Sequence, residues 1–442
     1  MRRILGTEPT LLGNPVMGSK VISDGQLPAE RGYRRSCCAL GGNNGRMRFI
    51  FLTLGYNPDL DGGGYRYATE VAELLAGRGH EVHAIYPNPG EALPADELRK
   101  GVHLHRLPRN GAGFLSRWRA TNAAARYCVA SLLNRPAKTL LFSHHAYLSP
   151  AAKGLRHCIF LHGPWALEHR LSVMAKPRNL WRRVLDRFSG LVMHRIERNS
   201  IAQASRVLVA SEYSRGHIPS WHRGVSCETE VVGGGADLVR FLPPVDRSQV
   251  RRHRGLGADE FLFLAVRRLD PRMGLMTLLE AFHPVARQFP NARLAIAGRG
   301  PQREELETRV RDLGLDRSVR LLGFVPEADL PGLYQSADCV LMPSLDLEGF
   351  GLATAEALAC GTPVLASSSG ANPELIRPLG EDLLFEAGNP RAIAEVMTGA
   401  LSGQIRLPGR EDCAEYARKA FRWDRPADAI ERAASSLALE SS

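Results

Sequence analysis

The feature that most constrains the fold of this chain is an alternation of short apolar runs with helical segments. It begins with the apolar run 48–54, a glycine-rich loop, a helical segment over about residues 65–78 and a second apolar run at 81–86. Further apolar runs lie at 139–142, 158–161 and 206–210. Runs of this length are typical of buried strands, and parallel strands joined through helices need right-handed crossovers. This half of the chain therefore predicts a mostly parallel sheet covered by helices.

The same alternation starts again after a Pro-Pro pair in the middle of the chain. The apolar run 261–266 is followed by apolar residues at helical spacing and by a second run at 293–298. Further runs lie at 319–322, 339–342 and 363–366. A chain of 442 residues is long enough to build two separate cores. We therefore predict an α/β protein with domains over 47–242 and 243–424, and a C-terminal helix within 425–442 that could pack back on the first domain.

The first 46 residues differ from the rest because they are rich in Gly, Arg, Pro and Ser and show no regular apolar period. We predict that residues 1–46 form a disordered extension and that Met47 is the natural start. No compact apolar stretch with a cleavage site follows the basic first residues, and no apolar run has the length of a membrane span. The eight cysteines are scattered without a Cys-x-x-Cys pair, which favours buried thiols over disulfides or zinc. These features predict a cytoplasmic protein.

The chain carries a formal net charge of +11, which favours an anionic partner such as a nucleotide diphosphate, a phosphorylated lipid or a membrane surface. No helix-turn-helix, zinc-finger or RNA-binding pattern accompanies this charge, so we do not expect nucleic acid as a partner. Arginines are mixed with apolar residues over 178–198 and over 114–119. Such stretches can lie on the anionic inner face of a membrane, but the sequence favours a helix with a packed apolar face and solvated arginines. Both interpretations stay open on the sequence.

The segment with the clearest chemical signal is 343–363. Glu348 is followed by Gly-Phe-Gly and by a helical segment, 352–360, which contains Glu356 and is ended by Gly361 and a proline. The glycines allow backbone amides to approach a ligand, and the helix N-terminus attracts phosphate. Glu348 would then lie beside that phosphate and accept hydrogen bonds from sugar hydroxyls, while Glu356 could accept them from a ribose. The alternative is a capping acid and a glutamate in an ordinary ion pair.

This string resembles the most specific motif of the GT-B glycosyltransferases, in particular the retaining group 1 family (glycosyltransferase family 4). The resembling features are Glu-x7-Glu with Gly-Phe-Gly between the two acids, followed by Ala-x-Gly-Thr-Pro-Val, and the likeness extends over about 48–435. It implies two Rossmann-like domains that face each other across a cleft. It also implies retaining transfer of a hexose from a nucleotide sugar, with no metal ion or other cofactor.

The resemblance also implies roles for residues outside this motif. Gly62–Gly64 look like the loop that faces the donor phosphates, although a triple glycine after a strand is also a common turn. His162 looks like the histidine that holds the donor sugar, and Arg268 like the arginine that binds the diphosphate. The catalytic residues implied in this way are His162, Arg268 and Glu348. The implied nucleotide-sugar site comprises Gly62, Gly63, Gly64, Arg268, Arg272, Gly298, Gly323, Val325, Gly349, Phe350, Gly351, Leu352 and Glu356.

One position departs from the family pattern. Met273 stands where a phosphate-binding lysine is usual, so Arg272 or Arg267 would have to supply the second cation. If neither does, the alternative is a nucleotide-sugar-binding protein without turnover, and a sugar-nucleotide epimerase on the same fold is a further one. A UDP- or GDP-hexose is the expected donor, with an ADP-hexose not separated from them. The acceptor stays open among a glycan, a lipid-linked sugar and a small molecule.

Overall fold

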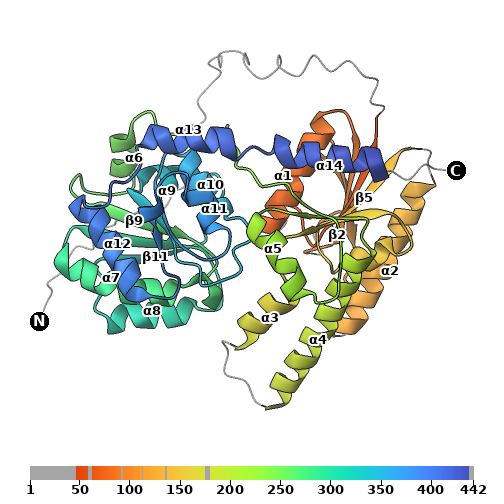
Figure 1. Cartoon of the computed structure of the whole chain (residues 1–442), viewed down its shortest axis with the longest axis horizontal. Coiled ribbons are helices and arrows are strands. Elements are labelled where there is room, and N and C mark those ends of the chain that lie inside the picture. The colour runs from red at the N-terminus through yellow and green to blue at the C-terminus, as the bar shows by residue number, and fades with distance from the viewer. Residues whose placement is uncertain are drawn as a thin grey trace, which may run out of the picture.

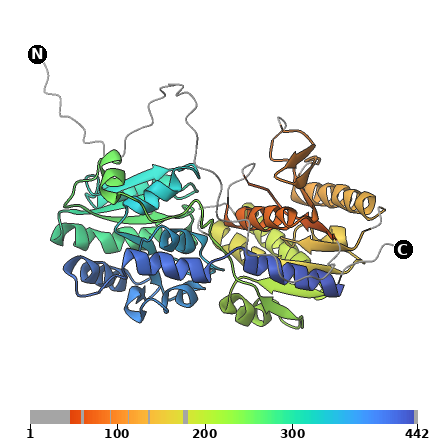
Figure 2. The same ribbon diagram turned by 90° about the horizontal axis from the view of Figure 1, so that it is seen from above.

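The computed structural model describes residues 46–57, 62–90, 93–111, 113–134, 137–174 and 180–437. The extension expected over 1–46 lies outside these residues except for Arg46. The chain forms two α/β halves, each built around its own sheet, that lie side by side (Figures 1 and 2). The predicted fold class is confirmed, because both sheets are parallel apart from one strand pair.

The first half contains an eight-stranded sheet in the order β3-β4-β2-β1-β5-β6-β7-β8. Its strands are β1 (Arg48–Leu52), β2 (Glu81–Pro87), β3 (Asp96–Arg99), β4 (Val102–Leu107), β5 (Thr139–Ser143), β6 (His157–Leu161), β7 (Arg206–Val209) and β8 (Thr229–Val231). The central strand β1 is buried throughout and pairs in parallel with β2 and β5, which explains why every residue after Arg48 in it is apolar. Only β3 runs antiparallel, against β4. Sequence reasoning missed the edge strand β3, because its four residues include three charged ones.

The helices of the first half lie on both faces of this sheet (Figure 1). They are α1 (Gly63–Gly77), α2 (Phe114–Leu133), the short η1 (Ser149–Ala152), α3 (Trp165–Met174), α4 (Leu180–Gln203) and α5 (Glu212–Trp221). Helix α1 begins two residues earlier than predicted, so Gly63 and Gly64 form its first turn and only Gly62 precedes it. Among the described residues, no helix is both long and apolar enough to cross a membrane.

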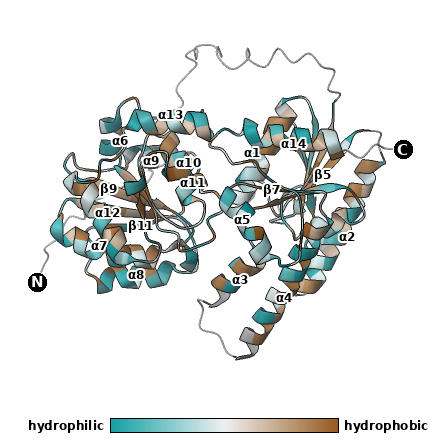
Figure 3. Cartoon of the chain, in the orientation of Figure 1, coloured by the Kyte–Doolittle hydropathy of each residue, from teal (hydrophilic) through white to brown (hydrophobic). Residues whose placement is uncertain are grey.

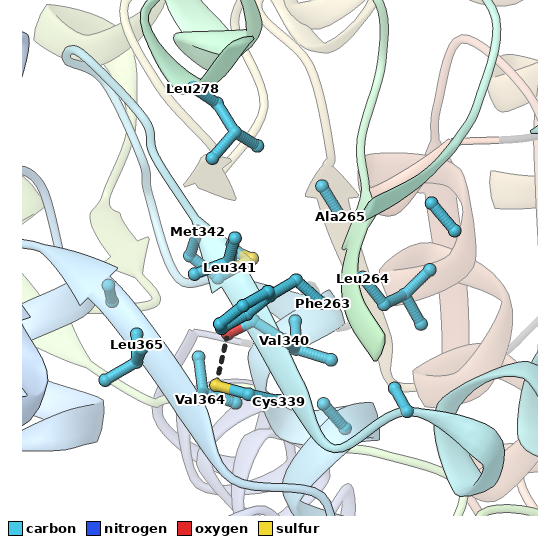
Figure 4. Close-up of a cluster of buried hydrophobic side chains, with 14 of the residues drawn as sticks. Phe263, Leu264, Ala265, Leu278, Cys339, Val340, Leu341, Met342, Val364 and Leu365 are labelled. Atoms are coloured by element: carbon cyan, nitrogen blue, oxygen red, sulfur yellow. Dashed lines mark hydrogen bonds between the residues drawn. The ribbon is translucent and has the colours of Figure 1, made fainter. Parts of the chain in front are cut away.

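The second half contains a six-stranded, fully parallel sheet in the order β11-β10-β9-β12-β13-β14. Its strands are β9 (Phe261–Val266), β10 (Ala292–Ala297), β11 (Val319–Gly323), β12 (Cys339–Met342), β13 (Val364–Ser367) and β14 (Leu384–Phe385). Its helices are α6 (Arg247–His253), η2 (Pro271–Met273), α7 (Leu275–Gln288), α8 (Arg303–Asp312), α9 (Leu330–Ser336), α10 (Leu352–Ala359), α11 (Asn372–Ile376), η3 (Glu381–Leu383), α12 (Pro390–Ser402) and α13 (Arg410–Ala420). Figure 4 shows its core, where Phe263 of β9 lies among residues of β12 and β13.

The last helix, α14 (Asp424–Leu437), leaves the second half and packs on the first (Figure 1). Its buried residues Ala427, Ile430 and Ala433 join the core formed by β1, β2 and α1. Arg78 at the end of α1 forms ion pairs with Asp428 and Glu431 of α14. The chain therefore crosses between the halves twice, once before α6 and once before α14.

Candidate functional site

The Glu348 loop lies where the two halves meet. It joins β12 to α10, and a Cβ atom built on Gly349 would lie only 2.2 Å from the carbonyl oxygen of His162 in the first half. A Cβ on Gly63 would lie 3.4 Å from the side chain of Leu352. The structure thus brings together the start of α1, the end of β6 and the motif before α10, which are far apart in sequence.

Two further contacts hold the halves together beside this loop. The carboxylate of Glu374 in α11 accepts hydrogen bonds from the backbone amides of Glu212 and Tyr213, at 2.9 and 2.6 Å. These amides form the first turn of α5, where a negative charge is favourable. The hydroxyl of Tyr213 donates to Asp346 at 2.8 Å. The Glu348 loop is therefore fixed against the first half on more than one side.

The N-terminus of α10 is shaped to receive an anion. Gly351, the residue before the helix, has a left-handed φ of 94°, which a side chain would strain. No side chain caps this helix, and the backbone amides that bond back to Gly351 are those of Thr354 and Ala355. Among the residues that the structure describes, the amides before them have no backbone acceptor, so they and the helix dipole can serve a phosphate.

Glu348 is held as a carboxylate. Its Oε2 atom accepts hydrogen bonds from Arg267 and from the hydroxyl of Ser344 at 3.1 Å. Burial alone would raise the pKa of Glu348, but the charge and hydrogen bond of Arg267, aided by Arg272, hold it below its ordinary value. Both of these bonds go to Oε2, so within the described part of the chain Oε1 of this ionised carboxylate can accept hydrogen bonds from sugar hydroxyls.

His162 lies in a cluster of three histidines. Its Nε2 atom is 2.7 Å from Nδ1 of His144, and its ring centroid is 5.2 Å from that of His145. A Cβ on Gly64 would lie 3.3 Å from His145, a slightly tight contact, and 3.5 Å from His162, so the start of α1 lies directly against both rings. Burial lowers the pKa of all three histidines, so their rings are neutral. A neutral imidazole can contact a ligand through hydrogen bonds but offers it no positive charge. Sequence reasoning missed His144 and His145, although they follow β5 directly and β5 neighbours β6.

The three arginines that follow β9 have different surroundings. Arg268 is exposed and makes no hydrogen bond or ion pair with the residues that the structure describes, and its charge acts on Tyr65 and Glu168 of the first half. Arg272 lies 3.5 Å from the carboxylate of Glu168 and donates to the carbonyl of Leu347. Arg267 is buried against Glu348. Arg268 is therefore the cation most free to meet a ligand.

Glu356 lies in a polar network that the sequence did not predict. Its oxygens accept hydrogen bonds from Arg66 of α1 and from the hydroxyl of Tyr334 at 2.9 Å. Arg66 also pairs with Glu327, which accepts from Asn57 at 2.6 Å and from a further arginine. Burial raises the pKa of Glu356 more than the charge of Arg66 lowers it. A ribose that binds Glu356 would therefore share this carboxylate with Arg66 or displace it.

The residues expected around the nucleotide base lie at the ends of β10 and β11. The amide of Gly298 donates to the carbonyl of Gly323 at 2.7 Å, and a Cβ on Gly298 would collide with the carbonyl of Arg267. Phe324 is exposed and has the guanidinium of Arg299 over its ring at 4.2 Å. The loops carrying Gly298 and Val325 are thus directly beside the arginine segment. Within the described ranges, no three His, Cys, Asp or Glu side chains gather in a way that could hold a metal ion.

Two family models match the chain. The model of glycosyltransferase family 4 matches residues 61–240, and the model of group 1 glycosyl transferases matches residues 246–420. These ranges correspond to the two halves.

Relatives and solved structures agree with these models. A GDP-mannose-dependent α-(1-6)-phosphatidylinositol monomannoside mannosyltransferase of Mycolicibacterium smegmatis is 37% identical over 180 residues, which are 39% of this chain and 47% of that relative. Sucrose-phosphate synthase from Thermosynechococcus elongatus superimposes with a TM-score of 0.76 at 21% identity, over 89% of this chain and 99% of that one. Anabaena HepE in complex with UDP-glucose gives a TM-score of 0.69 at 21% identity, over 89% and 100%. The two structures show that the fold is shared.

Proposed function

Since the chain belongs to the group 1 glycosyltransferases of the GT-B fold, we propose that it transfers a hexose from a nucleotide sugar to an acceptor hydroxyl with retention of configuration. The observation that supports this most is the convergence of Glu348, the free N-terminus of α10, His162 and Arg268 at the contact between the halves. A sugar diphosphate needs this combination, because one end must be bound as an anion and the other through hydroxyls.

In the proposed reaction, the bond between the anomeric carbon and the phosphate oxygen breaks, and its electron pair leaves with the nucleoside diphosphate. The acceptor oxygen bonds to the anomeric carbon on the same face, and the acceptor proton passes to the leaving phosphate. Negative charge grows on the diphosphate as the bond breaks, so Arg268 and the amides of α10 stabilise the transition state more than the ground state. His162 and Glu348 would hold the hexose. Charge neutralisation by the protein makes a metal ion or other cofactor unnecessary in this proposal.

We propose a UDP- or GDP-hexose as the donor. The mycobacterial relative is named for GDP-mannose, and the Anabaena structure is a complex with UDP-glucose. The base would lie between the loops that carry Gly298, Gly323 and Val325. For the acceptor, we propose a glycan or lipid-linked sugar that the first half binds in the cytoplasm.

A panel of nucleotide sugars tests this proposal. We expect one family among UDP-, GDP- and ADP-hexoses to raise the unfolding temperature and to be hydrolysed slowly, with EDTA present as well as with Mg²⁺. Ligand at 100 times its Kd should stabilise the protein by about 2.7 kcal/mol, a shift that thermal denaturation detects easily. Binding without release of nucleotide, even with acceptors present, would favour the protein without turnover. No binding by any of the panel would contradict the proposal.

The proposed membrane contact involves α4, which extends away from the sheet of the first half (Figures 1 and 3). The helix exposes four large apolar side chains, with 51 to 69% of each accessible: Val184, Leu185, Phe188 and Leu191. Exposed arginines accompany them on the same helix: Arg187, Arg195 and Arg198. The exposure of these four side chains supports the membrane contact over a helix whose apolar residues are all packed. Apolar side chains flanked by arginines suit the interface of an anionic membrane.

Two negative charges introduced on the apolar surface of α4 should weaken this contact. We expect L185E/F188E to reduce sedimentation with phosphatidylglycerol vesicles by at least about tenfold, because two apolar groups become anionic on the surface that meets the lipid. The control is V239E/V245E, which changes two exposed apolar residues away from α4. Equal sedimentation of the two variants, or none of the unaltered protein, would contradict the membrane contact.

A further inference from the structure

The side chain of Arg267 is buried in an unusual position beside the Glu348 loop. It follows β9, and only 6% of the side chain is exposed. Its Nη2 atom lies 2.7 Å from the sulfur of Met273 and its Nη1 atom 3.6 Å from the sulfur of Met342. A permanently charged group is thus packed largely against thioethers, which are weak hydrogen-bond acceptors.

The hydrogen bonds of this guanidinium are incomplete. Nη2 donates to Glu348 and to the hydroxyl of Ser344 at 2.7 Å. Nη1 has only the Met342 sulfur, and the buried Nε has no acceptor in the part of the chain that the structure describes. The charge itself is paired with Glu348, but leaving buried N–H donors without oxygen acceptors is costly, and an anionic ligand would supply such an acceptor.

The neighbouring cations are placed differently. Arg272 is directed to Glu168 and the carbonyl of Leu347, whereas Arg268 is exposed. Met273 is buried and touches the Arg267 guanidinium, so a lysine at 273 would put two cations in contact. A charged side chain at 267 therefore requires an uncharged side chain at 273.

We propose that Arg267 is the second phosphate-binding cation of the donor site, and that Met273 is neutral because Arg267 fills the place of a cation at 273. This inference rests on the proposed function. A phosphate oxygen of the donor would supply the acceptor that the Arg267 guanidinium lacks, while its bond to Glu348 orients the carboxylate toward the sugar.

Moving the charge between the two side chains tests the proposal. The nucleotide-sugar panel first identifies the base that the unaltered protein binds. The affinities of each variant for the nucleoside diphosphate and monophosphate of that base are then measured. R267A should weaken diphosphate binding by about 10- to 100-fold relative to the monophosphate, as expected for a lost charged hydrogen bond. R267A/M273K, which returns a cation to the same place from the other side chain, should regain most of this loss. R267K, which keeps the charge and the partner of Glu348, should lose less than R267A.

The outcomes separate the two proposals. An unchanged ratio of diphosphate to monophosphate affinity in R267A would overturn this inference while the proposed function stands. So would equal losses in R267A and in a folded R267A/M273K, because charge at this place would then not matter. Failure of the unaltered protein to bind any nucleotide would overturn the proposed function, and this inference with it.

Discussion

Gly349→Ala is expected to lower kcat/KM for transfer by about 100-fold or more without a large change in unfolding temperature. The added Cβ would lie 2.2 Å from the carbonyl oxygen of His162, so the two backbones must separate by more than 1 Å. Displacements of this size lower the reaction rate about 100-fold when the reacting groups must be aligned across an interface. The collision is between the halves and not within either core, which is why we expect a small effect on folding. Initial rates and thermal denaturation measure the two quantities.

A matched control is Gly216→Ala on α5. A Cβ built there meets nothing within 4 Å, so the same chemical change adds volume in open space. We expect this variant to keep full activity. If Gly349→Ala is as active as Gly216→Ala, the Glu348 loop and His162 do not have to touch during the reaction, and the proposed arrangement of the site is wrong.

The sequence predicted those elements most accurately whose structure depends on their own segment alone. The helix expected over 352–360 is α10, ended by Gly361 as expected, and the strands 261–266 and 139–142 lie within β9 and β5. These elements are buried and regular, so their apolar pattern and stop signals reflect their surroundings directly.

The sequence predicted less where a residue depends on contacts with a distant segment. The pairing of Arg66 with Glu356 and Glu327 joins α1 to the second half, and no spacing in the chain indicates it. The place of the Arg267 guanidinium was also open, because three arginines lie within six residues and only packing distinguishes them. Such contacts depend on how the halves meet, which local periodicity does not encode.

The second large effect concerns Glu356, which has both a structural and a proposed ligand-binding role. Glu356→Ala should lower donor affinity by about 10- to 100-fold, because a carboxylate that accepts from ribose hydroxyls is lost. It should also lower the free energy of unfolding by about 1 to 3 kcal/mol, since Tyr334 loses its acceptor and the half-buried Arg66 keeps Glu327 as its carboxylate partner among the described residues. Titration with the donor and urea denaturation measure the two effects.

The two roles of Glu356 separate in the double variant R66M/E356A. Removing Arg66 together with its partner takes away the half-buried charge that Glu356→Ala leaves poorly paired, so stability should be partly regained. Donor affinity should not be regained, because methionine and alanine offer no acceptor to a ribose. Recovery of both quantities would mean that Glu356 only neutralises Arg66, and that the nucleotide is held by other groups. Recovery of neither would mean that the stability lost in Glu356→Ala comes from the unpaired Tyr334 hydroxyl rather than from Arg66.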